Sequence, residues 1–139
     1  TYGEMYFTNV TGFDFPFATQ NVWYDFQGMH CEIANRINCS SPINYFTVLE
    51  DGWYEVFYNA VGEGENNHMY QTAVRVNNVV QENTVSFIRT DRSVTKSMVG
   101  GGYLNLTVND TVSLSIRDTS GNGDGIAYVA NFIIKRITE

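Results

Sequence analysis

Hydrophobic and polar residues alternate with a period of two through most of the chain, in short runs separated by Gly, Asn and Asp. Side chains that alternate in this way point to opposite faces of a β-strand, and Gly, Asn and Asp favour the turns between strands. The pattern predicts strands at residues 2–8, 21–27, 45–49, 53–61, 68–76, 85–90, 103–108, 111–117 and 126–137. No long run has the period of an amphipathic helix, so the sequence predicts an all-β antiparallel sandwich of about 8 to 10 strands.

The segments between these runs predict the connections. Residues 9–14 are expected to turn, and residues 28–42 are polar and irregular, with room for a helical turn. Asn77 and Asn78 tolerate positive φ, which suits a tight turn. The glycines at 100–102 are expected to precede a strand, and residues 62–67 and 118–125 are expected to be loops.

A chain of 139 residues corresponds to one domain, so residues 1–139 are predicted to share a single core. Hydrophobic residues make up 43% of the chain, yet they never gather into a run of about 18, which a membrane-spanning helix needs. We therefore expect no membrane insertion.

Charge excludes one class of partner and suggests another. The formal net charge is -7, and the arginines are scattered without a basic stripe, so nucleic acid is not expected to bind. Charged residues are only 17% of the chain, which is low for the surface of a free-standing monomer. That shortage suggests that partners cover part of the surface.

Cys31 and Cys39 are the two cysteines of the chain. We expect two free, partly buried thiols, with a disulfide between them as the alternative if their side chains face each other. A zinc site would need carboxylates in addition to these thiols and to His30 and His68.

Three motifs occur in an order that resembles the C1q/TNF-like jelly-roll domains. The segments are FTVLEDGWYEVFYNA at 46–60, AVRVNNVVQ at 73–81 and GGYLNLTVNDTVSLSIRD at 101–118. The first matches the family pattern at Phe46, Val48, Gly52, Tyr54, Val56 and Tyr58, the second at Val74, Val76 and Asn77, and the third at Leu104, Leu106, Asp110, Val112, Leu114 and Ile116. Asn78 and Asn109 stand where the family usually has glycine, and the ending ANFIIKRI lacks the usual glycine too.

This resemblance covers residues 43–139 and implies a jelly roll that forms homotrimers through one sheet. Carried over to this chain, it implies trimer contacts from Trp53, Phe57, Tyr103, Leu106, Tyr128, Phe132 and Ile134. Large residues fall on both faces of the run WYEVFYNAV, which independently suggests that one face is covered by a neighbour. The alternative is that these residues are all monomer core.

The opening YGEMYFTNVTGFDF resembles the first strand of phage and other viral virion proteins that use the same fold. The leading hypothesis is therefore a homotrimeric virion structural protein of a bacteriophage, a capsid decoration or fibre head at the virion surface. Its expected partners are itself, other capsid or fibre proteins and a host-surface receptor bound through the loops. The alternative is a secreted C1q-like domain that recognises a ligand.

No catalytic motif is present, and the chain is not expected to be an enzyme. No cofactor is expected, although Asp118, Asn122 and Asp124 supply oxygen ligands of the kind that calcium prefers. Their spacing is not that of an EF-hand, and a turn that needs Asx and Gly explains the same residues. Four Asn-x-Ser/Thr sequons begin at Asn9, Asn38, Asn105 and Asn109, and they would carry glycans only in a secreted eukaryotic protein.

Overall fold

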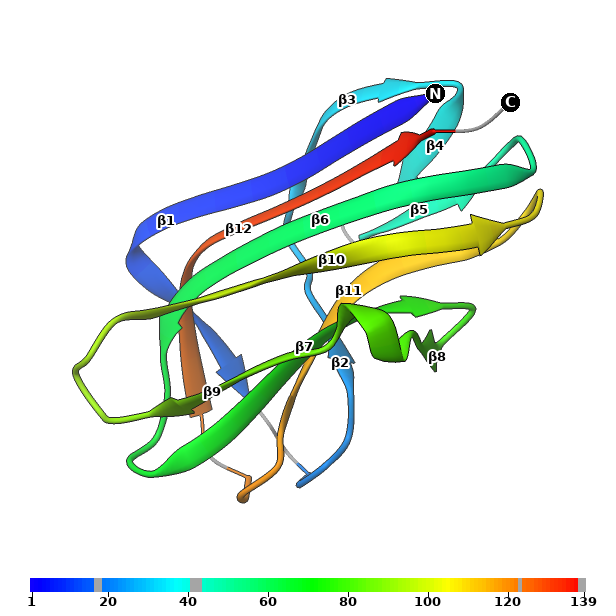
Figure 1. Cartoon of the computed structure of the whole chain (residues 1–139). Coiled ribbons are helices and arrows are strands. Elements are labelled where there is room, and N and C mark those ends of the chain that lie inside the picture. Colours follow the sequence, from blue (N-terminus) through cyan, green and yellow to red (C-terminus); the bar gives the residue numbers. More distant parts are fainter. Residues whose placement is uncertain (17–18, 41–43, 123, 138–139) are drawn as a thin grey trace.

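Two antiparallel β-sheets pack face to face in the computed structural model of this chain (Figure 1). The structure describes residues 1–16, 19–40, 44–122 and 124–137. One sheet has five strands in the order β10-β6-β12-β1-β3. The other has seven, with the order β4-β5-β11-β7-β8, and β2 and β9 pair with β11 and β7. This is the predicted all-β jelly-roll sandwich.

The strands follow the alternating runs of the sequence. The five-stranded sheet contains β1 (Tyr2–Pro16), β3 (His30–Asn35), β6 (Gly52–Glu63), β10 (Lys96–Leu106) and β12 (Asp124–Arg136). The seven-stranded sheet contains β2 (Tyr24–Asp25), β4 (Ile37–Ser40), β5 (Tyr45–Val48), β7 (His68–Val76), β8 (Val79–Val80), β9 (Ser86–Thr90) and β11 (Thr111–Asp118). A short 3-10 turn, η1 (Glu82–Thr84), precedes β9. None of the helical structure in the described part of the chain is long and apolar enough to cross a membrane.

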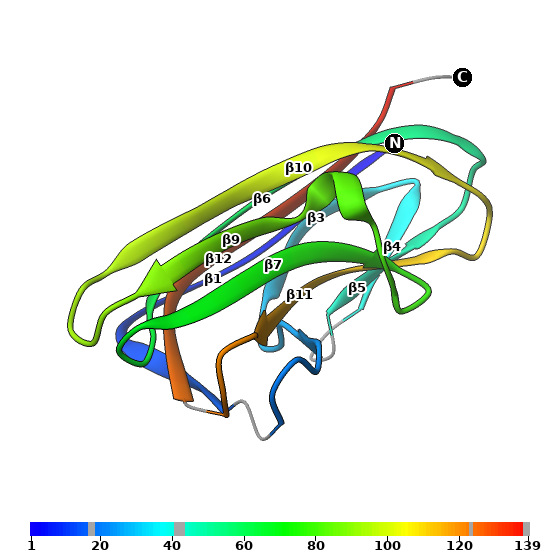
Figure 2. The ribbon, with the colours of Figure 1, turned by 60° about the horizontal axis from the view of Figure 1, so that its bottom comes forward.

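The two layers separate clearly when the molecule is turned (Figure 2). Strands β1, β12, β6 and β10 run together along one layer, with β7 and β11 in the other. The first and last strands are paired, so the chain begins and ends at the same end of the sandwich (Figure 1).

Large side chains from both sheets fill the space between the layers. Phe46 of the seven-stranded sheet meets Phe132 of the five-stranded sheet, with ring centroids 5.3 Å apart. Tyr58 is fully buried, and its hydroxyl donates to the carbonyl of Thr84 at 2.6 Å, which satisfies a polar group that burial would otherwise leave without a partner. Burial raises the pKa of Tyr58, and hydrogen bonds with the Thr72 side chain and the Ser86 backbone lower it in part.

Four local predictions differ from the structure. Residues 9–14 do not turn but continue β1, whose pairing with β12 shifts register between Thr8 and Phe13. An irregular ladder accommodates extra residues without ending the strand. The predicted strand at 21–27 shortens to β2, and most of the predicted irregular loop at 28–42 forms the strands β3 and β4.

The fourth difference is that the three glycines at 100–102 lie inside β10 instead of preceding a strand. A Cβ atom at Gly100 would lie 2.3 Å from the hydroxyl oxygen of Tyr58. Glycine at this position lets β10 pair closely with β6 while the large Tyr58 ring stays in the core.

The expectation of two free thiols is wrong, because Cys31 and Cys39 form a disulfide. The hairpin-like return from β3 to β4 brings their Cα atoms to 6.1 Å, within the distance a disulfide spans. Sequence spacing alone did not reveal this return because residues 28–42 lack a clean alternation. The tight turn at Asn77 and Asn78 is confirmed, with φ of 50° and 66°.

Candidate functional site

The outer face of the five-stranded sheet exposes large apolar side chains. In β6 the residues Tyr54, Val56 and Tyr58 are buried between the sheets, so alternation turns Trp53 and Phe57 to the outside. Trp53 is 47% exposed and Phe57 is 44% exposed. Exposed apolar patches on soluble proteins often mark contact surfaces, so this outer side is the candidate contact face.

Pairing extends this face across the neighbouring strands. Tyr103 of β10 and Lys135 of β12 flank Glu55 of β6, and Ile133 lies beside Phe57. Tyr2 of β1 and Ile33 of β3 continue the same face at the other edge. We define the apolar face as the six exposed side chains Tyr2, Ile33, Trp53, Phe57, Val99 and Tyr103.

Polar pairs interrupt the apolar face at defined places. The side-chain amide of Asn131 donates to that of Asn59 at 3.0 Å across β12 and β6. Glu55 and Lys135 are directly opposite each other in the same ladder. These pairs make the face polar at two places along its length.

The seven residues predicted for a trimer contact divide between the face and the core. Trp53, Phe57 and Tyr103 lie on the apolar face, and Tyr128 is half-buried next to the register shift between Ala127 and Val129. The remaining predicted residues, Leu106, Phe132 and Ile134, are at most 1% exposed and fill the space between the two sheets.

The physical reason for this division is the alternation itself. Leu106 is in phase with the buried Leu104, and Phe132 and Ile134 are in phase with the buried Ala130, so all three point inward. We therefore revise the candidate face to exclude them. Sequence reasoning missed Tyr2, Ile33 and Val99, whose outward direction follows only once the phase of each strand is known.

A buried carboxylate stands at the end of β11. Asp118 is 0% exposed, and its Oδ2 atom lies 2.6 Å from Nδ1 of His68, the first residue of β7. Its Oδ1 atom accepts hydrogen bonds from the backbone amides of Ser120 and Gly121. The carboxylate therefore fixes the start of the β11–β12 connection against β7.

The predicted calcium ligands are used differently in the structure. Asp118 is occupied by three hydrogen bonds from the chain, and Asn122 is exposed. The side chain of Asp124 lies outside the described residues. Within the described part of the chain no group of three or more His, Cys, Asp or Glu side chains is arranged to hold a metal ion.

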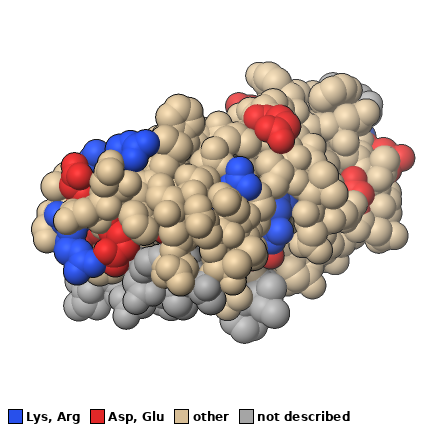
Figure 3. All heavy atoms as spheres, turned by 90° about the horizontal axis from the view of Figure 1, so that it is seen from below, with Lys and Arg blue, Asp and Glu red and all other residues tan. Residues whose placement is uncertain are grey.

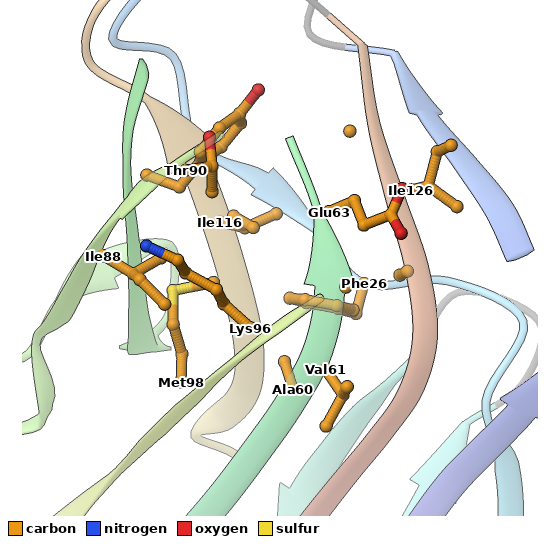
Figure 4. Close-up of a pocket in the computed structure, with 14 residues that line it drawn as sticks. Phe26, Ala60, Val61, Glu63, Ile88, Thr90, Lys96, Met98, Ile116 and Ile126 are labelled. Atoms are coloured by element: carbon orange, nitrogen blue, oxygen red, sulfur yellow. The ribbon is translucent and has the colours of Figure 1, made fainter. Parts of the chain in front are cut away.

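A mostly apolar cavity opens between the sheets at the same end of the sandwich. It has a volume of about 450 Å³ including its open mouth, and Phe26, Met98 and Ile116 are among the residues that line it. Figure 4 shows the charged ends of Lys96 and Glu63 with these apolar groups. Tyr70 also lines it, and burial raises the pKa of this tyrosine to about 12.

Charged side chains gather at the same end. Seen from below, red and blue atoms lie close together at the left of the molecule, and the other charged groups in that view are scattered, blue near the centre and red toward the right (Figure 3). Arg92 pairs with Glu65, and the Lys96 ammonium donates to the carbonyl of Arg89 at 2.8 Å. These exposed pairs contribute little to stability because water screens them.

Comparison with solved structures identifies the fold. An Eiger TNF from S. frugiperda superposes with a TM-score of 0.68 at 11% identity, with 99% of this chain and 93% of that chain covered. The globular domain of zebrafish complement 1qA superposes with a TM-score of 0.68 at 17% identity over 99% of this chain and 98% of that chain. Murine APRIL superposes with a TM-score of 0.60 at 9% identity over 99% and 100% of the two chains.

Sequence comparison adds no relative to these structures. No model of a protein family matches the sequence, and no curated protein matches it significantly. At identities of 9% to 17% the structural likeness establishes the fold without the function. The chain therefore has the C1q/TNF-like jelly-roll fold that its motifs predicted.

Proposed function

We propose that this chain is a homotrimeric, non-enzymatic binding module that associates through the apolar face of its five-stranded sheet. The observation that carries the proposal is the exposure of Trp53, Phe57 and Tyr103 on one side of a sheet whose other side is already packed. The motif resemblance to C1q/TNF-like domains supports an assembly of three copies related by a three-fold axis.

The size of the apolar face supports this role. An aromatic side chain has a surface of about 200 Å², so the exposed fractions of the four aromatic residues add to roughly 400 Å², and Ile33 and Val99 enlarge the patch further. That area is near the upper end of the largest apolar patch on a typical monomer, and such patches are often functional. Covering it in an assembly also accounts for the low share of charged residues.

The molecular mass of the assembled protein tests the proposal. We expect sedimentation velocity at micromolar concentration to give three times the chain mass of 15.7 kDa for the wild type and the monomer mass for Trp53→Glu. Val79→Glu is the matched control, since Val79 is 63% exposed on the seven-stranded sheet. A wild-type protein that stays monomeric, or a control that dissociates as readily as Trp53→Glu, would overturn the proposal.

We place the module at a virion surface, as a capsid decoration or fibre head of a bacteriophage whose partners are other capsid or fibre proteins and a host-surface receptor. The likeness of the opening segment to virion proteins supports this setting, and three copies would raise the avidity for a repeated receptor. Electron microscopy of native particles tests it by locating the chain at a vertex, a lattice three-fold or a fibre tip. Particles without the chain would contradict the setting.

A secreted C1q-like recognition domain is the second candidate, and the Cys31–Cys39 disulfide favours it because disulfides persist in oxidising compartments. Asn38 and Asn109, which begin two sequons, are exposed as glycan acceptors must be. Intact-mass measurement of the native protein separates the candidates. Glycan mass supports secretion, and the bare polypeptide mass supports the virion.

We propose that neither candidate function needs a cofactor. Asp118, the buried member of the predicted calcium set, already accepts three hydrogen bonds from the chain. Millimolar calcium is accordingly expected to leave the Tm unchanged, and a rise in Tm that Asp118→Asn abolishes would show that the ion binds there.

A further inference from the structure

A row of four side chains crosses the outer face of the seven-stranded sheet, on the opposite side of the molecule from the apolar face. Arg117 of β11 pairs with Gln71 of β7, and Gln71 pairs with Phe87 of β9. Trp23 lies beside β2 at the other end of the row, with its ring 4.7 Å from the Arg117 guanidinium carbon. We call these four residues the cross-strand row; at the usual strand spacing it is about 14 Å long.

The alternation of each strand places the row outside. Tyr70 and Thr72 are buried on either side of Gln71, and Ile116 and Asp118 are buried on either side of Arg117. Gln71 and Arg117 thus point away from the core, as does the 66% exposed Phe87, and the Trp23 ring lies against the outward Arg117 guanidinium. The row offers aromatic rings and polar side-chain groups to a ligand, because the backbone groups of these strands are already hydrogen-bonded to one another.

Arg117 is held in position without a carboxylate partner among the described residues. Its Nε atom donates to Oε1 of Gln71 at 2.8 Å, and its guanidinium stacks on Trp23. The described ion pairs use Arg36, Arg75, Arg92 and Arg136 and do not include Arg117. A fixed guanidinium whose terminal nitrogens are oriented in advance suits bidentate binding of a carboxylate.

A second arginine stands next to the row. Arg89 lies two residues after Phe87 in β9 and pairs with Met69, so it occupies the same outer face. Its guanidinium donates to Asn67 and is likewise absent from the described ion pairs. Two such cations on a chain of formal charge -7 form a local site that complements an anion.

Phe87 gives the site its apolar component. It is 66% exposed, the largest exposed fraction among the large hydrophobic side chains that the structure describes. A flat aromatic ring that stands free on a sheet offers a platform for another flat apolar surface. One face of a sugar ring, lined by C–H groups, provides such a surface next to hydroxyls that Gln71 can bind.

We infer that the cross-strand row binds a saccharide that carries a carboxylate group. Arg117 pairs with the carboxylate through its terminal nitrogens, Phe87 packs against a sugar ring, and the Gln71 side-chain amide donates to a hydroxyl. A saccharide fits better than an acidic peptide because the row crosses the strands and offers rings and side-chain donors, whereas peptides added to sheets bind along an edge through the backbone.

This inference names a ligand for the binding role proposed above, but the site lies within one copy and does not need self-association. Association of three copies would leave the three rows outside the apolar contact and would multiply a weak single-site affinity. Binding and assembly are therefore separable in experiment.

The test is titration of the wild-type protein with 3′-sialyllactose, an acidic trisaccharide, and with lactose, its neutral part, followed by two-dimensional NMR. We expect saturable shifts at residues of the row with sialyllactose and at least tenfold weaker binding of lactose. Arg117→Gln and Phe87→Ser are each expected to weaken sialyllactose binding at least tenfold. Arg36→Gln is the matched control, since the Arg36 side chain is 71% exposed and lies between β3 and β4, outside the strands that carry the row. This variant is expected to bind sialyllactose as the wild type does.

Several results would overturn the inference. They are equal binding of sialyllactose and lactose, an unchanged affinity in both Arg117→Gln and Phe87→Ser, and a polyglutamate peptide that binds at the row more tightly than the sugar. Phe87→Ser alters an exposed side chain, so it stays informative if Arg117→Gln fails to fold. Trp53→Glu separates the two proposals, because a monomeric variant is still expected to bind sialyllactose at each copy. A wild type that binds sialyllactose but never trimerises would contradict the proposed assembly and leave this inference standing.

Discussion

Replacing Phe57 by alanine removes a defined part of the apolar face and should weaken the assembly by an amount that the structure predicts. Phe57 is 44% exposed, and 44% of an aromatic surface of about 200 Å² is about 90 Å². At about 25 cal/mol per Å² the loss is ~2 kcal/mol for each copy, or ~6 kcal/mol for a trimer that buries all three rings.

This free energy translates into a measurable shift in concentration. A loss of ~6 kcal/mol raises the dissociation constant of a trimer about 10⁴-fold. Because that constant has the dimensions of concentration squared, the protomer concentration at half-dissociation rises by the square root, about 100-fold. Mass photometry at nanomolar concentrations and sedimentation velocity at micromolar ones together cover that range.

Val79→Ala is the control for this measurement, since Val79 is exposed in β8 on the other sheet and should leave the midpoint where it is in the wild type. Circular dichroism at high concentration checks that both variants keep their strands. A midpoint for Phe57→Ala within threefold of the wild type would refute the placement of Phe57 in the contact, as would equal shifts in the two variants.

Three further outcomes concern the stability of the chain. Asp118→Ala leaves His68 and two backbone amides without their acceptor and should lower the free energy of unfolding by about 3 kcal/mol in urea titrations, so a loss below 1 kcal/mol would contradict the buried network. Burial raises the pKa of Tyr70 to about 12, so Tyr70 ionises at lower pH in the unfolded chain than in the folded one, and its contribution to the free energy of unfolding is fully present below pH 10 and is lost between pH 10 and 12. Tyr70→Phe should make the free energy of unfolding fall less steeply over this range. Urea titrations that give the same pH dependence for the wild type and the variant would contradict this. Reducing the disulfide between Cys31 and Cys39 should lower the free energy of unfolding by about 2 to 3 kcal/mol, since the bond closes a short loop. In calorimetry, reductant should lower the Tm of the wild type but not that of a variant with serine at both positions.

The sequence was a good guide wherever the alternation was clean. The run at 68–76 predicts β7 with both of its ends, and the runs at 45–49 and 111–117 predict β5 and β11 to within one residue. These segments have turn residues at their boundaries, and their polar and apolar positions agree with one buried and one outer face. Local chemistry thus determined both the class of fold and most of its strands.

Boundaries were predicted poorly where the register of a distant strand decided the conformation. Residues 9–14 contain turn residues, but pairing with β12 keeps them in a strand. The glycines of β10 look like a break in sequence, yet Gly100 makes room for the Tyr58 ring, 42 positions earlier, and Gly101 lies against the backbone of β6. Hydrogen bonds and packing between remote segments outweighed the local preference in both places.

The sequence by itself determined that two sheets form and that aromatic residues exceed what one thin core holds, because both properties follow from alternation and composition. It did not determine which of these residues reach the outside, since the phase of each strand is set by its neighbours. Only the tertiary structure placed Trp53, Phe57 and Tyr103 on an outer face while Phe132 and Ile134 filled the core. It also brought Asp118 to His68, 50 residues away, and aligned the cross-strand row, because contacts between distant segments depend on the register of the folded sheets.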